Sequence, residues 1–288
     1  MSYQQFLSLF RERNIFNAVV LLGLIFLVVI LSLSSGSVEL SSHEIIKAFL
    51  REGDLTNQII FWELRLPRLI ASLLVGSALG MSGALLQGML RNGLASPYLL
   101  GISAGSGLVI VLMISMGLWF SWIPIAAWLG AILTTFIVYF LARSGGAISV
   151  ERLILGGVAL SSLFGAIQSM LLLQTEDGRV QAALTWLIGS LNSRGWPEIK
   201  LAGPPILFAL IMSLLLSRQL NLLGLGDELS VGLGNSLFRS RCLIGASATL
   251  LAASSVSVGG LIGFVGLIVP HAVRFLFGTD YRLVLPFS

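Results

Sequence analysis

The chain has 288 residues, of which 56% are hydrophobic and only 10% are charged, and its net charge is +4. Soluble domains carry about 25% charged residues, so this composition excludes a water-soluble protein and predicts an all-α protein that crosses a membrane many times. The positive charge does not indicate nucleic-acid binding, because no basic patch with interleaved aromatic residues occurs in the sequence. Cys242 is the single cysteine, which excludes an internal disulfide.

Long apolar segments predict about eight membrane-spanning helices and the start of a ninth. The first, 17–33, could also be a signal peptide, because small residues follow it; the many later spans favour an uncleaved helix. Residues 41–63 are amphipathic and predict a surface helix on the outer interface. Residues 182–188 could form a short helix above a pore. The remaining predicted spans are 66–90, 98–116, a segment that ends at 141, then 153–173, 202–216, 243–258 and 261–277, and the ninth apolar run begins at 283.

The predicted helix 66–90 carries a small residue at every fourth position. This spacing places the small side chains on one helix face, where another backbone can approach closely. The pattern fits a moving part of a transport pathway and fits ordinary membrane-helix packing equally well. The five positions are Ser72, Gly76, Gly80, Ala84 and Gly88.

Charge placement gives an orientation and restricts the energy source. Arginines are more frequent in the polar segments that lie on the same side of the membrane as the N-terminus, which favours a cytoplasmic N-terminus. All acidic residues fall outside the predicted spans, which argues against a proton- or sodium-coupled carrier. The sequence has no G-x-x-x-x-G-K-[ST] loop to bind ATP. Energy for uphill transport would therefore come from another subunit, and the polar stretch 218–241 is the expected contact.

Five segments carry a resemblance to a known family: ELRLPR, SGALLQGMLRNGLASPYLLGISAG, LILGGVALS, NLLGLGDELSVGLG and GGLIGFVGLIVPHAVRFLFGTDYRLVLP. With them the chain resembles the FecCD-type (BtuC-like) permeases, the membrane subunits of ABC importers for ferric siderophores, haem and vitamin B12. The resemblance implies the type II ABC importer transmembrane fold for 1–288 as one permease domain. Family members have ten membrane helices, so the last two are expected to be lacking here. Gly93 stands where the family most often has proline.

The resemblance assigns a role to each end of the protein. Arg65 and Arg68 would face outward and pair with acidic residues of a substrate-binding protein, as exposed arginines on a rigid helix end can do. Ordinary snorkelling of these two side chains at the interface is the alternative. On the inner side a short helix would contact the ATPase, with acidic residues at its positive dipole end and glycines at the turns, rather than form a solvated loop. Its residues are Gly226, Asp227, Glu228, Gly232 and Gly234.

The resemblance also implies an inner gate. It would be built from Asn92 and Leu94 in the turn after the second helix, and from Val150 and Glu151 before the fifth. His271 follows a proline and could suggest an iron ligand, but a lone histidine is more often a packed, hydrogen-bonded residue. No catalytic residue, metal site or cofactor is expected.

These observations together predict the permease subunit of an ABC importer in the bacterial cytoplasmic (inner) membrane. The expected partners are a second permease (a homodimer or a heterodimer with a close paralogue), two ABC ATPase subunits, a substrate-binding protein and the lipid bilayer, with no nucleic acid. The second and fifth helices would line part of the pathway. The expected cargo is a ferric siderophore, with cobalamin and haem as alternatives. The alternative class is an ATP-independent secondary transporter or channel.

Overall fold

The computed structural model describes residues 3–36, 38, 40–118, 120–144, 147–192 and 194–288, and almost all regular structure in them is helical. The first elements are α1 (Tyr3–Ser34), α2 (Ser42–Phe49), α3 (Leu55–Ile59), the π-helix η1 (Ile60–Arg65) and α4 (Leu66–Leu90). After them come the 3₁₀ turn η2 (Pro97–Leu100), α5 (Ile102–Ser115), the 3₁₀ turn η3 (Phe120–Trp122), α6 (Ile123–Ala142), β1 (Arg143–Ser144), β2 (Ala147–Ile148) and α7 (Val150–Leu173). The last elements are α8 (Asp177–Ile188), α9 (Trp196–Leu215), α10 (Ser217–Gly224), α11 (Asp227–Gly232), α12 (Leu237–Gly259), α13 (Val265–Phe277) and α14 (Tyr281–Phe287).

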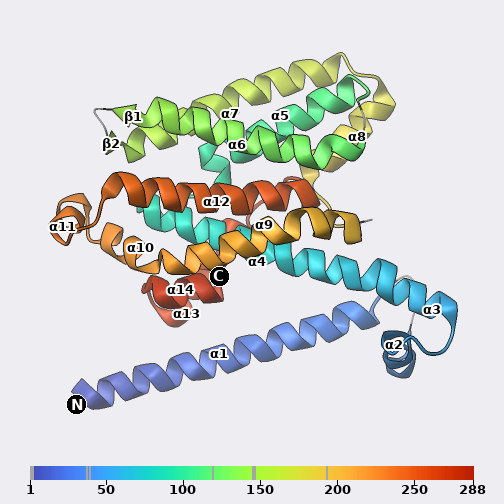
Figure 1. The fold of residues 1–288 in the computed structure, drawn as a ribbon. Coiled ribbons are helices and arrows are strands. Elements are labelled where there is room, and N and C mark those ends of the chain that lie inside the picture. The colour runs from blue at the N-terminus through green and yellow to red at the C-terminus, as the bar shows by residue number, and fades with distance from the viewer. Residues whose placement is uncertain (1–2, 37, 39, 119, 145–146, 193) are drawn as a thin grey trace.

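Helix α4 lies at the centre of the molecule (Figure 1), where it packs against α12, α13 and α9. Pro67 lies at the start of α4, directly after the π-helical turn η1. Every residue from 78 to 90 is buried. This helix is therefore the core of the fold rather than one wall of it.

Helices α5, α6 and α7 pack together in a layer at the top of Figure 1. The strands β1 and β2 form a small antiparallel hairpin between α6 and α7, with Arg143 opposite Ile148. Helix α8 packs on α5 at the opposite end, so the short helix expected at 182–188 exists but begins at Asp177.

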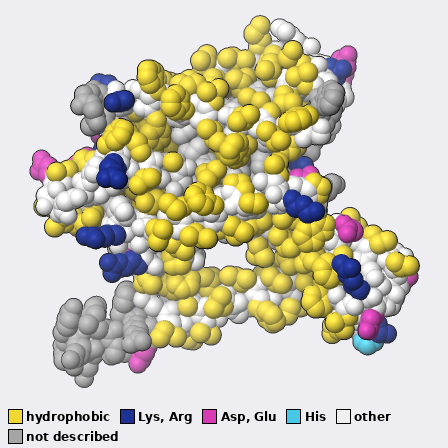
Figure 2. All heavy atoms as spheres, viewed as in Figure 1, with side chains coloured by type: hydrophobic (Ala, Val, Ile, Leu, Met, Phe, Trp, Pro, Cys, Tyr) yellow, Lys and Arg dark blue, Asp and Glu magenta, His cyan; other side chains and the backbone are white. Residues whose placement is uncertain are grey.

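The surface is that of a membrane protein. Among the described residues six helices are long and apolar enough to cross a membrane, and α5 and α13 are shorter apolar helices. Hydrophobic side chains cover the middle of the molecule in Figure 2, and the charged side chains gather toward its two ends. The N-terminus, the β hairpin and α11 lie at one end, and α2, α3 and α8 lie at the other (Figure 1). The prediction of an all-α polytopic protein is confirmed.

Two expectations from the sequence are wrong in detail. Residues 41–63 do not form one surface helix, because only α2 stands apart; α3 and η1 continue into α4 as one apolar helix, Leu55–Leu90. Glu63 lies inside that helix, and Glu151 and Glu198 lie in the first turns of α7 and α9. Spanning helices therefore do carry carboxylates. Glu151 and Glu198 lie at helix ends, and Glu63 is exposed in the π-helical turn η1, so water or headgroups can solvate all three.

Candidate functional site

A polar hollow of about 770 Å³ opens at the end opposite α11, which the sequence predicts to face outward. The end of α1, the π-helical turn η1 and the loop before α9 form its wall. Arg65 and Arg68, which the sequence pointed to, both line it, and Arg194 joins them. The other lining residues are Ser32, Ser35, Gly36, Val38, Ile60, Glu63, Leu64, Asn192 and Gly195.

Arg65 is not the freely exposed arginine that the sequence reading expected. It is half-buried, and its guanidinium donates hydrogen bonds to the backbone carbonyls of Leu33, Ser34 and Val38. The last carbonyls of a helix lack intrahelical partners, so Arg65 satisfies the end of α1. Its main contacts hold α1 against the central helix.

Arg68 has more freedom to meet a ligand, whereas Arg194 is partly held in place. Arg68 is exposed, one turn further along the helix from Arg65. The guanidinium of Arg194 lies 4.3 Å from the centre of the Trp186 ring, and its Nε donates to the carbonyl of Ser190 at 3.4 Å. Partial burial lowers the pKa of Arg194, and nearby Glu198 opposes that change. Sequence reasoning missed Arg194; its place in the polar stretch on the same side as Arg65 was the available signal.

At the end that holds α11, which the sequence predicts to face inward, α4 finishes in a turn that carries two of the expected gate residues. Arg91 takes the left-handed conformation (φ 50°), and Asn92 N–H donates to the carbonyl of Gln87 at 3.1 Å. The side-chain oxygen of Asn92 accepts from the N–H of Leu94 at 2.9 Å, which fixes the turn. Leu94 is 74% exposed, so it is free to contact another chain.

The other expected gate residues begin α7. The hydroxyl of Ser149 accepts from the N–H of Arg152 and donates to a carboxylate oxygen of Glu151 at 2.6 Å. Val150 packs partly buried against the core. Among the described residues no hydrogen bond joins this segment to Asn92 or Leu94, so the structure does not bring the two halves of the expected gate into polar contact.

Helix α11 is built as the sequence predicted. Asp227 and Glu228 occupy its first turn, where acidic side chains favour the positive end of the helix dipole. Gly226 before the helix (φ 103°) and Gly234 after it (φ 82°) take positive φ values, whereas Gly232 lies within the helix and does not. The segment is a short helix between two glycine turns and not an irregular loop.

The sequence and the fold are both similar to those of known proteins. The FecCD transport family matches residues 24–288. The chain belongs to the FecCD transport family. The uncharacterized ABC transporter permease protein YvrB of Bacillus subtilis is 36% identical, with 96% of this chain and 83% of YvrB covered.

Two further matches include a solved structure. The iron(3+)-hydroxamate import system permease protein FhuG of B. subtilis is 36% identical, over 92% of this chain and 81% of FhuG. A structure described as an inward-facing metal-chelate type ABC transporter matches with a TM-score of 0.84 and 31% identity, over 92% of this chain and 83% of that one. The fold is therefore that of this family's membrane permeases.

The small-residue face of this FecCD family member is only partly a contact face. Ala84 is fully buried, and a Cβ at Gly88 would lie 2.7 Å from the side chains of Leu220 and Tyr281. Gly80 also lies against backbone, whereas Gly76 has no atom within 4 Å of its Cβ position and the hydroxyl of Ser72 bonds within its own helix. The tightest contact along α4 is at Gly83, which lies three residues from Gly80 and faces the same helix, α13.

The backbone of Gly83 meets the backbone of Gly266 where α4 crosses α13. A side chain at Gly83 would overlap the carbonyl oxygen of Gly266, and one at Gly266 would come within 2.8 Å of the carbonyl oxygen of Leu79. Both positions therefore require glycine.

The described residues hold no group of three or more side chains of the types that bind metals. His271 is exposed on α13, so the expectation of a packed histidine is wrong.

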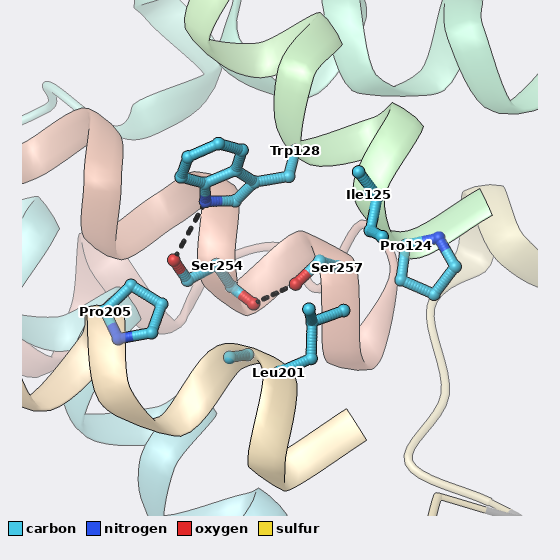
Figure 3. Close-up of a pocket in the computed structure, with 8 residues that line it drawn as sticks. Pro124, Ile125, Trp128, Leu201, Pro205, Ser254 and Ser257 are labelled. Atoms are coloured by element: carbon cyan, nitrogen blue, oxygen red, sulfur yellow. Dashed lines mark hydrogen bonds between the residues drawn. The ribbon is translucent and has the colours of Figure 1, made fainter. Parts of the chain in front are cut away.

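A second cavity, of about 330 Å³, lies between α6, α9 and α12 (Figure 3). Its polar groups are already paired, since the indole N–H of Trp128 donates to the hydroxyl of Ser254 at 3.1 Å and Ser257 donates to the Ser254 carbonyl. The other lining residues are Pro124, Ile125, Leu201, Ala202 and Pro205. Among the described residues that line this cavity none is charged, so the cavity offers no charge to bind a polar chelate.

Proposed function

We propose that the chain is the permease subunit of an ABC importer that carries an iron chelate, haem or vitamin B12 across the bacterial cytoplasmic membrane. A ferric siderophore is the proposed cargo. Support comes from relatives named for iron(3+)-hydroxamate, Fe(3+)-citrate, hemin and cobalamin import. In this proposal a separate subunit hydrolyses ATP and a binding protein delivers the cargo.

The main structural support for the proposal is the exposed apolar surface of helix α11. The helix lies at the end that holds the N-terminus (Figure 1), yet it exposes two large apolar side chains, Leu229 and Val231, and Leu233 directly after it is exposed as well. Water disfavours such a patch, and a rigid helix that presents one typically docks into a groove of a partner. An ATPase subunit is the partner proposed here, with Glu228 at the edge of the contact and the N-terminus in the cytoplasm.

The outer hollow is the proposed contact for the binding protein. Arg68 would form a charge-assisted hydrogen bond with an acidic side chain of that protein. Arg65 would contribute mainly by its charge, because its hydrogen-bond donors already serve the end of α1. Such contacts set the rate and the specificity of docking more than its raw affinity.

Helix α7 is the proposed surface for a second permease and for the pathway. It exposes Leu155, Val158, Leu163 and Met170 along its length. Helix α4 was also expected to line the pathway, but its residues 78–90 are all buried inside the protein. We therefore assign the pathway to α7 and not to the inner half of α4.

Uptake by cells tests the proposal. A strain that lacks this gene is compared with the same strain carrying the chain, using radiolabelled ferric hydroxamate, haem and cobalamin. Restored ferric hydroxamate uptake, lost again when the P-loop lysine of the co-purifying ATPase is replaced, is the expected result. Restored haem or cobalamin uptake alone would correct the cargo. Uptake that survives the ATPase substitution would indicate an ATP-independent carrier instead.

A further inference from the structure

Asp227, at the start of α11, binds two arginines from different helices. Its Oδ1 accepts hydrogen bonds from Arg91 Nη2 at 2.7 Å and from Arg241 Nη2 at 2.9 Å, and its Oδ2 accepts from Arg241 at 2.9 Å. Arg91 ends α4, and Arg241 lies in the first half of α12. One carboxylate therefore joins the proposed ATPase contact to the two central helices.

The two ion pairs differ in burial, which gives them different roles. Arg241 is only 3% exposed, and it also donates to the carbonyl of Ile148 in β2 at 2.8 Å. Breaking this buried pair would leave an uncompensated charge, so it is a fixed anchor. Arg91 and Asp227 are each more than a third exposed, and water can replace either partner at little cost. This pair can open and close.

Arg91 has a left-handed backbone conformation that is unusual for a residue with a side chain. Arg91 N–H bonds to the carbonyl of Gly88 and Asn92 N–H to that of Gln87, a Schellman motif with Arg91 in the left-handed position. Glycine is usual there, because a Cβ is strained in this conformation. An arginine at this position gives up backbone stability, and the contact that it gains is the one with Asp227.

We propose that the Arg91–Asp227 pair links movements of α11 to the inner turn that carries Asn92 and Leu94. Gly226 and Gly234 flank α11 and allow it to tilt, while Arg241 holds Asp227 near α12. When α11 tilts with its partner, Asp227 stays with Arg241 and the exposed Arg91–Asp227 pair opens or closes, so the turn that follows Arg91 is released or held. Arg91 is a positioning residue in this scheme, which rests on the proposed ATPase contact at α11.

Arg91→Gly tests the link with little risk to folding, because glycine favours the same backbone conformation. Arg51→Gly is the matched control. Arg51 ends α2 at φ 59° with the same pair of backbone hydrogen bonds, to Ala48 and from Glu52 to Lys47, but it lies at the outer end over the Trp62 ring. Both variants remove a strained arginine, and only one removes the contact with Asp227.

The measurement is amide hydrogen exchange of residues 91–95, with the chain in nanodiscs and with the co-purifying ABC ATPase absent or present. ATPase binding should change exchange in this turn for the wild type and Arg51→Gly, and not for Arg91→Gly, although α11 is protected in all three. Cargo imported per ATP hydrolysed should fall by on the order of fivefold for Arg91→Gly, the lower end of coupling between linked sites. An unchanged response of the turn in Arg91→Gly overturns the link.

The response of the wild type distinguishes failure of the link from failure of the proposed function. If no ABC ATPase protects α11 in the wild type, the proposed function of α11 is wrong, and the link falls with it. If the wild type responds and transports normally while Arg91→Gly does the same, the proposed function stands and only the link is refuted.

Discussion

The contact between Gly83 and Gly266 gives a direct test of how the core of this permease is packed. Replacing Gly83 with alanine adds one methyl group where α4 crosses α13. The added carbon would overlap the carbonyl oxygen of Gly266 and lie close to two further backbone atoms of that residue. Backbone atoms cannot rotate aside, so the two helices must separate. Gly76→Ala adds the same group to the same helix with no atom within 4 Å.

The expected magnitude follows from two opposing terms. Alanine is favoured over glycine in a helix by about 1 kcal/mol, which should stabilise both variants. Overpacking of a close contact costs about 1–3 kcal/mol, and this term applies to Gly83 alone. Gly83→Ala should therefore be less stable than Gly76→Ala by about 1–3 kcal/mol.

Reversible unfolding in mixed micelles, driven by increasing denaturing detergent, measures this difference for the purified chain. Circular dichroism of the folded variants confirms that both retain the native helix content at the start. Equal stabilities for Gly83→Ala and Gly76→Ala would refute the inferred backbone contact between α4 and α13.

Three further predictions concern the proposed contacts. Arg68→Glu should reduce the affinity for the loaded binding protein, measured by surface plasmon resonance. If the affinity and its dependence on salt concentration both stay unchanged, Arg68 does not take part in docking. Glu228→Arg combined with Gly232→Trp should reduce the ATPase that co-purifies with the chain, because charge and bulk are added to α11; equal recovery of ATPase would contradict its role. Leu94→Cys, cross-linked between two permeases, should block uptake of the cargo, and full uptake after efficient cross-linking would reject Leu94 as a gate residue.

The fold was largely predictable from the sequence, because runs of neighbouring apolar residues determine where its helices lie. Runs of apolar residues placed the spanning helices, and the glycines and acids of α11 predicted a short helix between two turns. The long amphipathic segment before α4 was misread, since its apolar residues fit both a surface helix and an extension of a span. In the structure the left-handed turn at Arg51 ends α2, and Phe49 packs back against Phe61 and Trp62 of the central helix.

The site was less predictable, because its contacts join distant parts of the chain. Arg65 lies at the end opposite α11, and its hydrogen-bond partners lie 27 to 32 residues away, at the end of α1 and just after it, where no local sequence pattern indicates them. The pair formed by Arg91 and Asp227 spans 136 residues. The small-residue face suggested close packing on one side of α4, and Gly80 does pack against α13. The tightest contact of α4 is at Gly83, which faces the same helix but falls outside the four-residue spacing.

The uninterrupted helix Leu55–Leu90 has a mechanical consequence. At 1.5 Å per residue it is about 54 Å long, well beyond the hydrocarbon thickness of about 30 Å. Between Arg68 and Arg91 it is a regular α-helix, a stiff rod of about 35 Å. A rotation of the helix at Arg68 would therefore also rotate the turn at Arg91, because no kink or break lies between the two residues. The π-helical turn at Ile60–Arg65 lies outside this stretch, so any slippage of register there would occur before the rod and not within it.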